Sequence, residues 1–439
     1  MFASLEDVLA KMRENGAARI YAKELAPNDN SKNQVYLGGD FSALNVLPHG
    51  DIYTDETDLA GSVRDRAKAE IEFYWIDHDG KHLAPNAGLI LYPKYPEVRM
   101  SGFLLGCNAA PSPIMRVRET GRVLILGVTP SGKILGYAAG KGDVVAEQVL
   151  SGDWPTIGIF LELPLWLDST QSSRAILLSE LRRIWEMHWI ASQKLGGDGF
   201  KKPYSARNGG GYTLEAELGV APNSYAEPDF RGWEIKQYSV RDFEKFAPKS
   251  PVTLMTPEPN GGIYRTEGVQ EFIRRFGYPD RSGKPDRMNF GGRYDCRRGA
   301  HPLTGLRMSL NGYDQSSGTI SDLDGGLELV DAQEQVAASW TFKGLMKHWN
   351  RKHAQAAYVP SLFQTPPPQY RYGPLISLCE QTDFLLFLKA FASGRVYYDP
   401  AVKIEAASTA SPKIKRRSQF RVAHMELPAL YKLYERIQF

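Results

Sequence analysis

The stretch AEPDFRGWEIKQYS, residues 226–239, decides what kind of fold this chain builds. It places one acid at Asp229, a second at Glu234 and a lysine at Lys236. If GWEIK is a strand, its side chains alternate, so Glu234 and Lys236 share one face. Asp229 precedes an Arg-Gly bend that can bring it back beside Glu234. The stretch therefore predicts a strand that gathers two carboxylates and an amine.

These residue types suit a metal ion that acts on a phosphate. Two carboxylates, with the backbone carbonyl of Ile235 between them, match the ligands that Mg²⁺ prefers, so Asp229, Glu234 and Ile235 are the predicted metal ligands. The ion would stabilise charge on a phosphate and lower the pKa of a bound water. Lys236 could orient or deprotonate that water, or neutralise charge in the transition state. The same letters also arise by chance at strand edges, so this spacing alone leaves an ordinary charged strand open.

Length and composition are those of a soluble chain with more than one domain. The chain has 439 residues, of which 42% are hydrophobic and 23% charged. No apolar run is long enough to span a bilayer, and the N-terminus lacks the apolar core of a signal peptide, which predicts no membrane association. Three separated cysteines with no CxxC pair favour a reducing compartment. The net charge of +3 does not identify a nucleic-acid binder by itself.

The two halves of the chain differ in pattern. Residues 1–167 hold short β-type runs separated by Gly, Pro, Asn and Asp, which predicts an all-β domain. GVTPSGKI at 127–134 resembles the start of a phosphate-binding loop, but Ile134 stands where Ser or Thr is needed, so a β-hairpin is preferred there. Residues 168–174 are the predicted linker. In 175–439 helices and strands mix, and 277–305 is expected to be a long loop.

The flanks of the opening stretch carry a resemblance to a known family. NGGGYTLEAELG at 208–219 places three glycines before a short helix, ahead of PDF and WEIK. With this order of motifs the chain resembles the MutH-like nucleases of the MvaI/BcnI restriction endonuclease type. The resemblance implies an α/β restriction-endonuclease-like fold with a mixed central sheet over 175–439. Its implied catalytic residues are Asp229, Glu234, Lys236 and Glu215, with Glu217 facing solvent.

In that family, DNA sequence is read by segments near the C-terminus. RVYYDPAVKIEAASTASPKIKRRSQFRVAHM, residues 395–425, has a suitable order of strand, basic loop and second strand. Arginines there could contact guanine edges and lysines could hold phosphates. Asp399, Arg417 and Arg421 are the expected base-reading residues, with phosphate contact or a solvated tail as the open alternatives.

The N-terminal half resembles the effector domain of EcoRII-type restriction endonucleases, an all-β pseudobarrel that grips DNA with two arms. KELAPNDNSKNQVYL at 23–37 matches the first arm and LILYPKYPEVRMSG at 89–102 the second. A solvated hairpin remains open for the first arm, and Pro96 stands where the relative has a basic residue. The resemblance implies that DNA is contacted by Asn28, Asp29, Asn30, Ser31, Lys32, Asn33, Gln34, Lys94, Glu97 and Arg99.

Together the resemblances imply a magnesium-dependent type II site-specific deoxyribonuclease that cuts at CC(A/T)GG. Its partners would be two copies of double-stranded DNA, one on each domain, with the N-terminal copy as an effector. The protein is expected to be monomeric in the bacterial cytoplasm, nucleoid-associated on DNA, and accompanied by a cognate methyltransferase. Two alternatives stay open: a MutH-like mismatch-repair nickase, and a DNA-binding regulator whose nuclease fold has lost activity.

Overall fold

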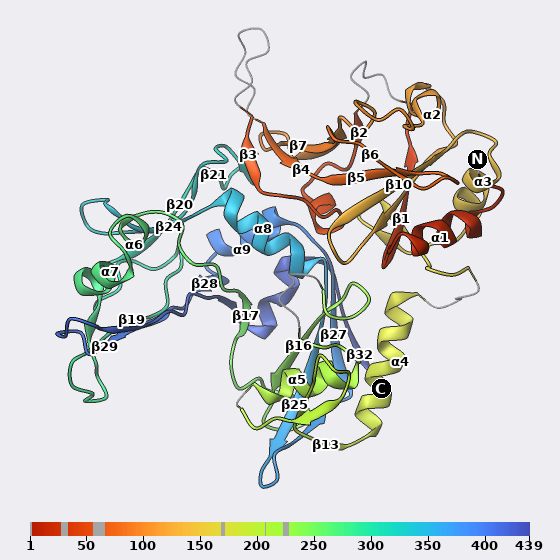
Figure 1. Cartoon of the computed structure of the whole chain (residues 1–439). Helices are drawn as coiled ribbons and strands as arrows, with labels where there is room; N and C mark the ends of the chain where they lie inside the picture. The colour runs from red at the N-terminus through yellow and green to blue at the C-terminus, as the bar shows by residue number, and fades with distance from the viewer. Residues whose placement is uncertain (1, 28–33, 56–65, 168–171, 207, 223–227) are drawn as a thin grey trace. The chain divides into compact units, whose positions relative to one another are not determined.

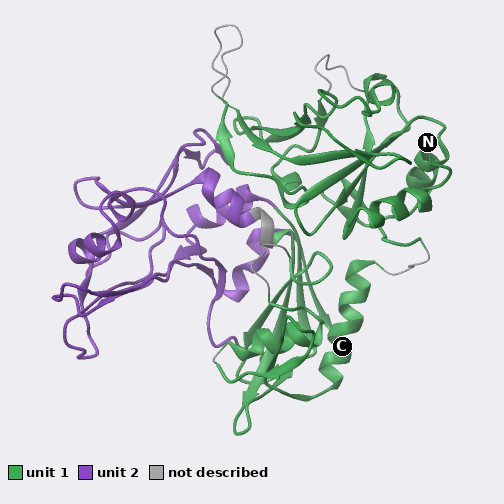
Figure 2. Ribbon diagram, in the orientation of Figure 1, with its two compact units in different colours: residues 1–247, 350–382, 433–439 green, residues 248–349, 383–432 purple. Residues whose placement is uncertain are grey.

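The computed structural model describes residues 2–27, 34–55, 66–167, 172–206, 208–222 and 228–439, without the side chains of 350–352. The chain divides into two compact units (Figure 2). The first comprises residues 1–247, 350–382 and 433–439, and the second residues 248–349 and 383–432. Among the described residues, no helix is long and apolar enough to cross a membrane.

The N-terminal region of the first unit is built from two sheets (Figure 1). The seven-stranded sheet has the order β11 (Thr156–Ile157), β12 (Phe160–Leu163), β1 (Arg19–Leu25), β9 (Arg122–Val128), β10 (Lys133–Ala139), β5 (Glu72–Ile76), β6 (Lys81–Leu83). The five-stranded sheet has the order β2 (Val35–Tyr36), β8 (Glu97–Ser101), β7 (Gly88–Tyr92), β4 (Ala67–Glu70), β3 (Ile52–Thr54). Among the described strands, each of these two sheets has two edge strands and does not close on itself. The pseudobarrel therefore stays a prediction. The short helices here are α1 (Leu5–Glu14), η1 (Ser42–Asn45), α2 (Ser112–Arg116) and α3 (Val144–Ser151).

Helix α1 closes the core of the seven-stranded sheet. Ser4 caps it by accepting a hydrogen bond from the backbone N–H of Asp7. Its buried Leu5, Val8, Leu9 and Met12 recur at helical spacing and pack with sheet residues such as Ile125. The amphipathic N-terminal pattern therefore forms a structural helix.

The segment that resembles a phosphate-binding loop is a β-hairpin, as predicted. Strands β9 and β10 pair in antiparallel register, and the backbone N–H of Thr129 donates to Lys133 O at 3.0 Å. Gly132 adopts a φ of 84°, which glycine reaches without strain. Because a strand follows the turn, there is no helix N-terminus for a phosphate to approach.

The remainder of the first unit surrounds a six-stranded mixed sheet. Its strands are β13 (Trp189–Ala191), β26 (Gln369–Tyr372), β25 (Gln355–Gln364), β27 (Leu375–Thr382), β32 (Tyr431–Gln438) and β16 (Glu234–Ser239). Strand β16 runs parallel to β25, whereas β26 and β27 pair with β25 antiparallel. One face of this sheet forms a core with helices α4 (Ser173–Glu186) and α5 (Gly209–Glu217). The hairpin β14 (Gln193–Leu195) and β15 (Lys201–Pro203) lies beside α5.

The second unit combines small antiparallel sheets with four helices in its described residues. The sheets are β17 (Val252–Met255), β31 (Phe420–Val422), β28 (Val396–Tyr398); β18 (Tyr278–Pro279), β19 (Arg287–Gly291), β29 (Ala401–Glu405), β30 (Lys413–Lys415); β20 (Arg307–Asn311), β23 (Gly326–Val330), β24 (Val336–Thr341); and β21 (Tyr313–Asp314), β22 (Thr319–Ile320). The helices are α6 (Ile263–Thr266), α7 (Val269–Phe276), α8 (Phe342–His353), whose end from residue 350 belongs to the first unit, and α9 (Phe384–Ala392), followed by the 3-10 helix η2 (His424–Leu430).

The stretch 277–305, expected to be a long loop, contains two strands. Strand β19 lies between β18 and β29 in a four-stranded sheet. Asp280 orders the turn that follows β18, since its carboxylate accepts hydrogen bonds from the backbone N–H groups of Ser282 and Lys284 and from the Asn289 amide. A hydrogen bond from the Ser282 hydroxyl, followed by those from Asn289 and the backbone of Lys284, holds the pKa of Asp280 well below its usual range. Long-range strand pairing orders a segment whose Pro and Gly content alone indicated a loop.

Candidate active site

A two-residue turn at Arg231-Gly232 brings the two ends of the opening motif together. Phe230 and Trp233 exchange both backbone hydrogen bonds, at 2.9 and 2.8 Å. The φ angles of Arg231 and Gly232 are 46° and 87°, the paired positive values of a type I′ hairpin turn. Asp229 and Glu234 therefore lie opposite each other across the hairpin. Asp229 Oδ2 also accepts a hydrogen bond from the backbone N–H of Ile235, at 2.9 Å.

Glu234 and Lys236 share one face of β16, and Lys236 Nζ lies 2.9 Å from Glu234 Oε1. Glu234 is 5% exposed, so this carboxylate is largely removed from water. The alternate residues Trp233 and Ile235 pack into the core on the opposite face. Ile235 can therefore serve a bound ion only through its backbone.

The parallel neighbour β25 adds buried residues to the face that carries Glu234 and Lys236. Ala356 is the partner of Glu234 and Tyr358 the partner of Lys236. Cys379 follows on β27 as the partner of Ala356. Burial raises the pKa of the Cys379 thiol, so the thiol stays protonated at neutral pH and is not a nucleophile. The low-polarity surroundings strengthen the electrostatic interactions of Glu234 and Lys236.

The residues at this strand fit a magnesium ion. Glu234 Oε2 is buried and has no hydrogen-bond partner among the described residues, although buried carboxylate oxygens normally have one. The described residues contain no group of three or more His, Cys, Asp or Glu arranged to hold a metal. Two carboxylates supplemented by backbone and water oxygens are nevertheless a common donor set for Mg²⁺. Asp229 and Glu234, with the backbone of Ile235, are the residues that would hold it.

Helix α5 is held close to the sheet by its glycines, which form its first turn and do not precede it. A Cβ on Gly209 would lie 2.6 Å from Ser192 Oγ, and one on Gly210 would lie 2.8 Å from Gln237 Oε1. Tyr372 donates its hydroxyl hydrogen to Gly210 O at 2.7 Å. Glu215, the predicted helix-borne acid, lies on this helix and is partly exposed.

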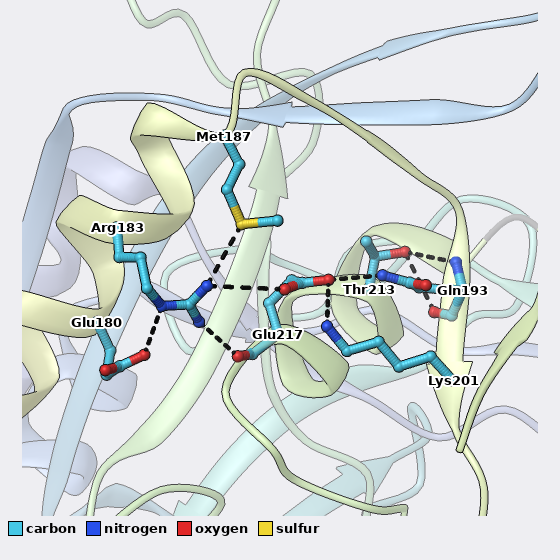
Figure 3. Close-up of polar contacts among 7 residues, drawn as sticks. All are labelled: Glu180, Arg183, Met187, Gln193, Lys201, Thr213 and Glu217. Atoms are coloured by element: carbon cyan, nitrogen blue, oxygen red, sulfur yellow. Dashed lines mark hydrogen bonds and ion pairs between the residues drawn. The ribbon is translucent and has the colours of Figure 1, made fainter.

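The prediction that Glu217 faces solvent is wrong. Glu217 is 7% exposed and its carboxylate lies 2.7 Å from Lys201 Nζ and 3.9 Å from Arg183 Nη1 (Figure 3). Gln193 donates to the same carboxylate at 2.6 Å. The reason is tertiary: α4 and the β14–β15 hairpin cover this side of α5 and supply its partners.

Thr213 completes the attachment of α5 to β14 (Figure 3). Its hydroxyl accepts from the backbone N–H of Gln193 at 3.0 Å and donates to Gln193 O at 3.2 Å. The Thr-Leu-Glu motif thus contributes a structural anchor in Thr213. Sequence reasoning missed Arg183, Gln193 and Lys201, because they lie up to 34 residues from Glu217 and no local pattern joins them.

The expected base-reading residues lie in the second unit, on strands β28 and β31 and on the paired segments next to them. Arg421 pairs with Tyr397 across β31 and β28, and Arg421 Nη1 lies 2.8 Å from Asp399 Oδ2. Arg421 Nη2 donates to Pro251 O at 2.9 Å, so both ends of its guanidinium already have protein partners. Arg417 is exposed, and its backbone carbonyl accepts from Ala401 N–H. The structure places Asp399 and Arg421 together and leaves the Arg417 side chain at the surface.

The expected DNA-contacting arms of the N-terminal region can be followed only in part. Asn28, Asp29, Asn30, Ser31, Lys32 and Asn33 lie outside the described residues. Gln34 is described, and Arg99 donates to its Oε1 at 3.3 Å. Arg99 also lies 2.8 Å from Glu97 and stacks over the Tyr92 ring. Lys94 lies in the β7–β8 turn, next to Tyr95, which is 79% exposed.

Comparison with known proteins places the chain among the restriction endonucleases. Residues 178–431 match the family model described as the MvaI/BcnI restriction endonuclease family. The match spans more than half of the chain, and the chain belongs to that family. It is therefore a nuclease of the restriction endonuclease class.

Two solved structures are similar to the same part of the chain. They are restriction endonuclease MvaI with its cognate DNA substrate, at a TM-score of 0.44, and MvaI without DNA, at a TM-score of 0.34. Both share 17% sequence identity and cover 61% of this chain and 99% of the other. No curated protein matches the chain. The family assignment rests on the family model, and residues 1–177 lie outside its match.

Proposed function

We propose that this restriction endonuclease is a magnesium-dependent type II enzyme that hydrolyses DNA at CC(A/T)GG through Asp229, Glu234 and Lys236. The observation that carries the proposal is the hairpin that sets Asp229 opposite Glu234, while one buried oxygen of Glu234 has no partner among the residues that the structure describes. A buried anion with an unused acceptor is costly in free energy unless a cation meets it. The neighbouring Lys236 supplies a proton-carrying group 2.9 Å from Glu234.

Each residue has a distinct task in this proposal. Asp229 and Glu234 would each offer carboxylate oxygens to the ion, and the hydrogen bond from the backbone N–H of Ile235 fixes Asp229. A bound Mg²⁺ would stabilise negative charge on the scissile phosphate and lower the pKa of a water. Lys236 Nζ positions the attacking water or exchanges a proton with it. Glu215, carried by α5, would contact the ion directly or through water.

The second part of the proposal concerns the N-terminal region. Residues 1–167 form the effector domain, 168–174 the linker and 175–439 the catalytic domain. Arg99 supports the effector role, because Glu97, Gln34 and Tyr92 hold its guanidinium in place. An ordered arginine is suited to guanine or phosphate contact. One monomer would then bind two copies of DNA, in a system with its own methyltransferase.

The direct test is cleavage of plasmids that carry one, two or no CC(A/T)GG sites, with Mg²⁺ and with or without a short specific duplex added in trans. We expect double-strand cleavage at the sites and stimulation by the added duplex. Lys236→Ala should abolish cleavage, and Arg99→Ala should reduce the stimulation. Absence of cleavage by the unaltered protein contradicts the enzyme proposal and favours a DNA-binding regulator.

The remaining outcomes separate the parts of the proposal. Cleavage that ignores site number and added duplex contradicts the effector role. Nicks that never become double-strand breaks favour a mismatch-repair nickase. Thermal unfolding with added Mg²⁺ gives a readout without DNA: the midpoint should rise for the unaltered protein and not for Glu234→Gln, because binding to the folded state alone stabilises it.

A further inference from the structure

A buried carboxylate in the second unit organises arginines that the proposed site does not use. Asp295 is 3% exposed and follows strand β19 in the sequence GGRYDCRR. Its Oδ2 accepts from Arg293 Nε and from Arg298 Nε, each at 3.1 Å. Its Oδ1 accepts from the backbone N–H of Arg297 at 3.0 Å. One buried anion therefore fixes a turn that carries three arginines.

Arg293 is held on three sides. Beyond its bond to Asp295, its Nη2 donates to Gly394 O at 3.2 Å. Its guanidinium carbon lies 4.0 Å from the centroid of the Tyr397 ring, within the range of a cation–π interaction. Tyr397 pairs with Arg421 across the strands, so Arg293 lies next to the residues expected to read bases. Arg293 loses little conformational entropy on meeting a ligand, because its side chain is already ordered.

Arg298 is anchored only at its inner nitrogen. Its side chain is 59% exposed, and neither terminal nitrogen has a hydrogen-bond partner among the described residues. Arg297 is also exposed. Because residues 293–298 carry three arginines and a single carboxylate, this turn keeps a net positive charge. Free terminal nitrogens in a fork match the oxygens of a phosphate group.

We propose that the turn at residues 293–298 is a DNA-backbone clamp in which Arg293 and Arg298 bind a phosphate of the DNA and Asp295 positions both arginines. This inference rests on the proposed function, and it names a contact surface outside Asp399, Arg417 and Arg421. We assign Arg293 to a phosphate, because its contacts with Asp295 and Gly394 O leave fewer free donors for the paired contacts that guanine recognition uses. Phosphate contacts set the position of the protein on the duplex and carry no sequence information.

The test is DNA binding without cleavage, measured by fluorescence anisotropy with Ca²⁺ in place of Mg²⁺ over a range of salt concentrations. Two duplexes are used, one with CC(A/T)GG and one without. Each variant is measured in the full chain with Arg99 and in the full chain with Arg99→Ala. The Arg99→Ala change weakens the DNA contact expected of the N-terminal region. We expect Arg298→Ala to raise the Kd for both duplexes by a similar factor, about tenfold, and to reduce the salt slope by about 0.9.

Three variants serve as controls. Arg298→Lys keeps the charge and should retain most of the affinity and slope. Arg307→Ala removes a partly exposed arginine that is paired with Glu334, and should change neither. Asp295→Asn adds one unit of positive charge, so a purely electrostatic role predicts tighter binding. A positioning role predicts weaker binding, because the two guanidinium groups lose their shared anchor.

Two results would overturn the proposal. The first is that Arg298→Ala binds both duplexes as tightly as Arg307→Ala does, both with Arg99 present and with Arg99→Ala. This result would show that Arg298 makes no phosphate contact. A loss confined to the CC(A/T)GG duplex, with an unchanged salt slope, makes Arg298 a base reader and not a phosphate contact. Binding is measured without cleavage, so failure of the clamp is distinguishable from absence of nuclease activity.

Discussion

The carboxylate of Asp229 accepts a hydrogen bond from the backbone N–H of Ile235, at 2.9 Å, across the turn formed by Arg231 and Gly232. This bond ties the first acid of the motif to the strand that carries the second acid and the lysine. The geometry of the turn therefore controls the geometry of the candidate site.

Gly232→Ala should impair both stability and cleavage. Gly232 has a φ of 87°, and a side chain there costs about 1 kcal/mol of folding free energy. Relief of that strain would move Asp229 away from Glu234. We therefore expect the cleavage rate to fall by more than the loss of folded protein explains. Chemical denaturation and single-turnover cleavage measure the two effects.

Arg231→Asn is the matched control for the turn. Arg231 has a φ of 46°, and asparagine tolerates this region better than arginine. We expect equal or slightly higher stability with cleavage preserved. Loss of cleavage in this variant would indicate that the Arg231 side chain itself takes part.

Lys236→Ala and Glu234→Gln should abolish cleavage while DNA binding persists. Removal of a group that transfers or positions a proton costs about 10²–10⁴-fold in rate. Neither variant removes a predicted DNA-reading residue, so affinity for DNA should stay within a few-fold. Single-turnover cleavage and anisotropy on the same duplex separate these effects, and a variant that still cuts at the normal rate contradicts the assigned role.

The two acids of helix α5 should give opposite results. Glu217→Gln removes buried charge interactions with Lys201 and Arg183, so we expect a loss of about 1–2 kcal/mol in the free energy of unfolding. Glu215→Gln should leave stability nearly unchanged and slow cleavage about 10–100-fold, as expected of a group that supports a metal site. Equal losses of unfolding free energy in both variants would contradict the assignment of a structural role to Glu217 and not to Glu215.

Stability of the second unit should fall on mild acidification because of His424. Burial lowers the pKa of His424 to about 4 from 6.5. The unfolded chain therefore takes up a proton near pH 6.5 while the folded chain does not. The stabilising contribution is complete above about pH 6.5 and decreases as the pH falls toward 4. Denaturation midpoints between pH 8 and 4 should decrease less in His424→Gln, whereas removal of the exposed His78 should preserve the decrease.

The strand, the turn and the order of motifs around 226–239 could be predicted from sequence because each depends on neighbouring residues. Alternation along β16 follows from the pleat, and Arg-Gly is a turn signal that acts over four residues. The same locality explains why the hairpin at 127–134 was predicted correctly.

Contacts between distant segments could not be predicted in this way. Nothing near Glu217 indicates that Lys201 and Gln193 cover it, and nothing near Asp295 indicates that Tyr397 receives Arg293. The strands within 277–305 exist because β29, more than a hundred residues later, pairs with β19.

The sequence alone determined the chemistry that this protein can carry: two acids and a lysine on one strand, a glycine-led helix before them, and the family pattern that they form. The tertiary structure decided which of the other charged residues are buried, paired or free. The physical reason is that strand alternation and turn geometry are local, whereas burial of a charge depends on which segments pack over it.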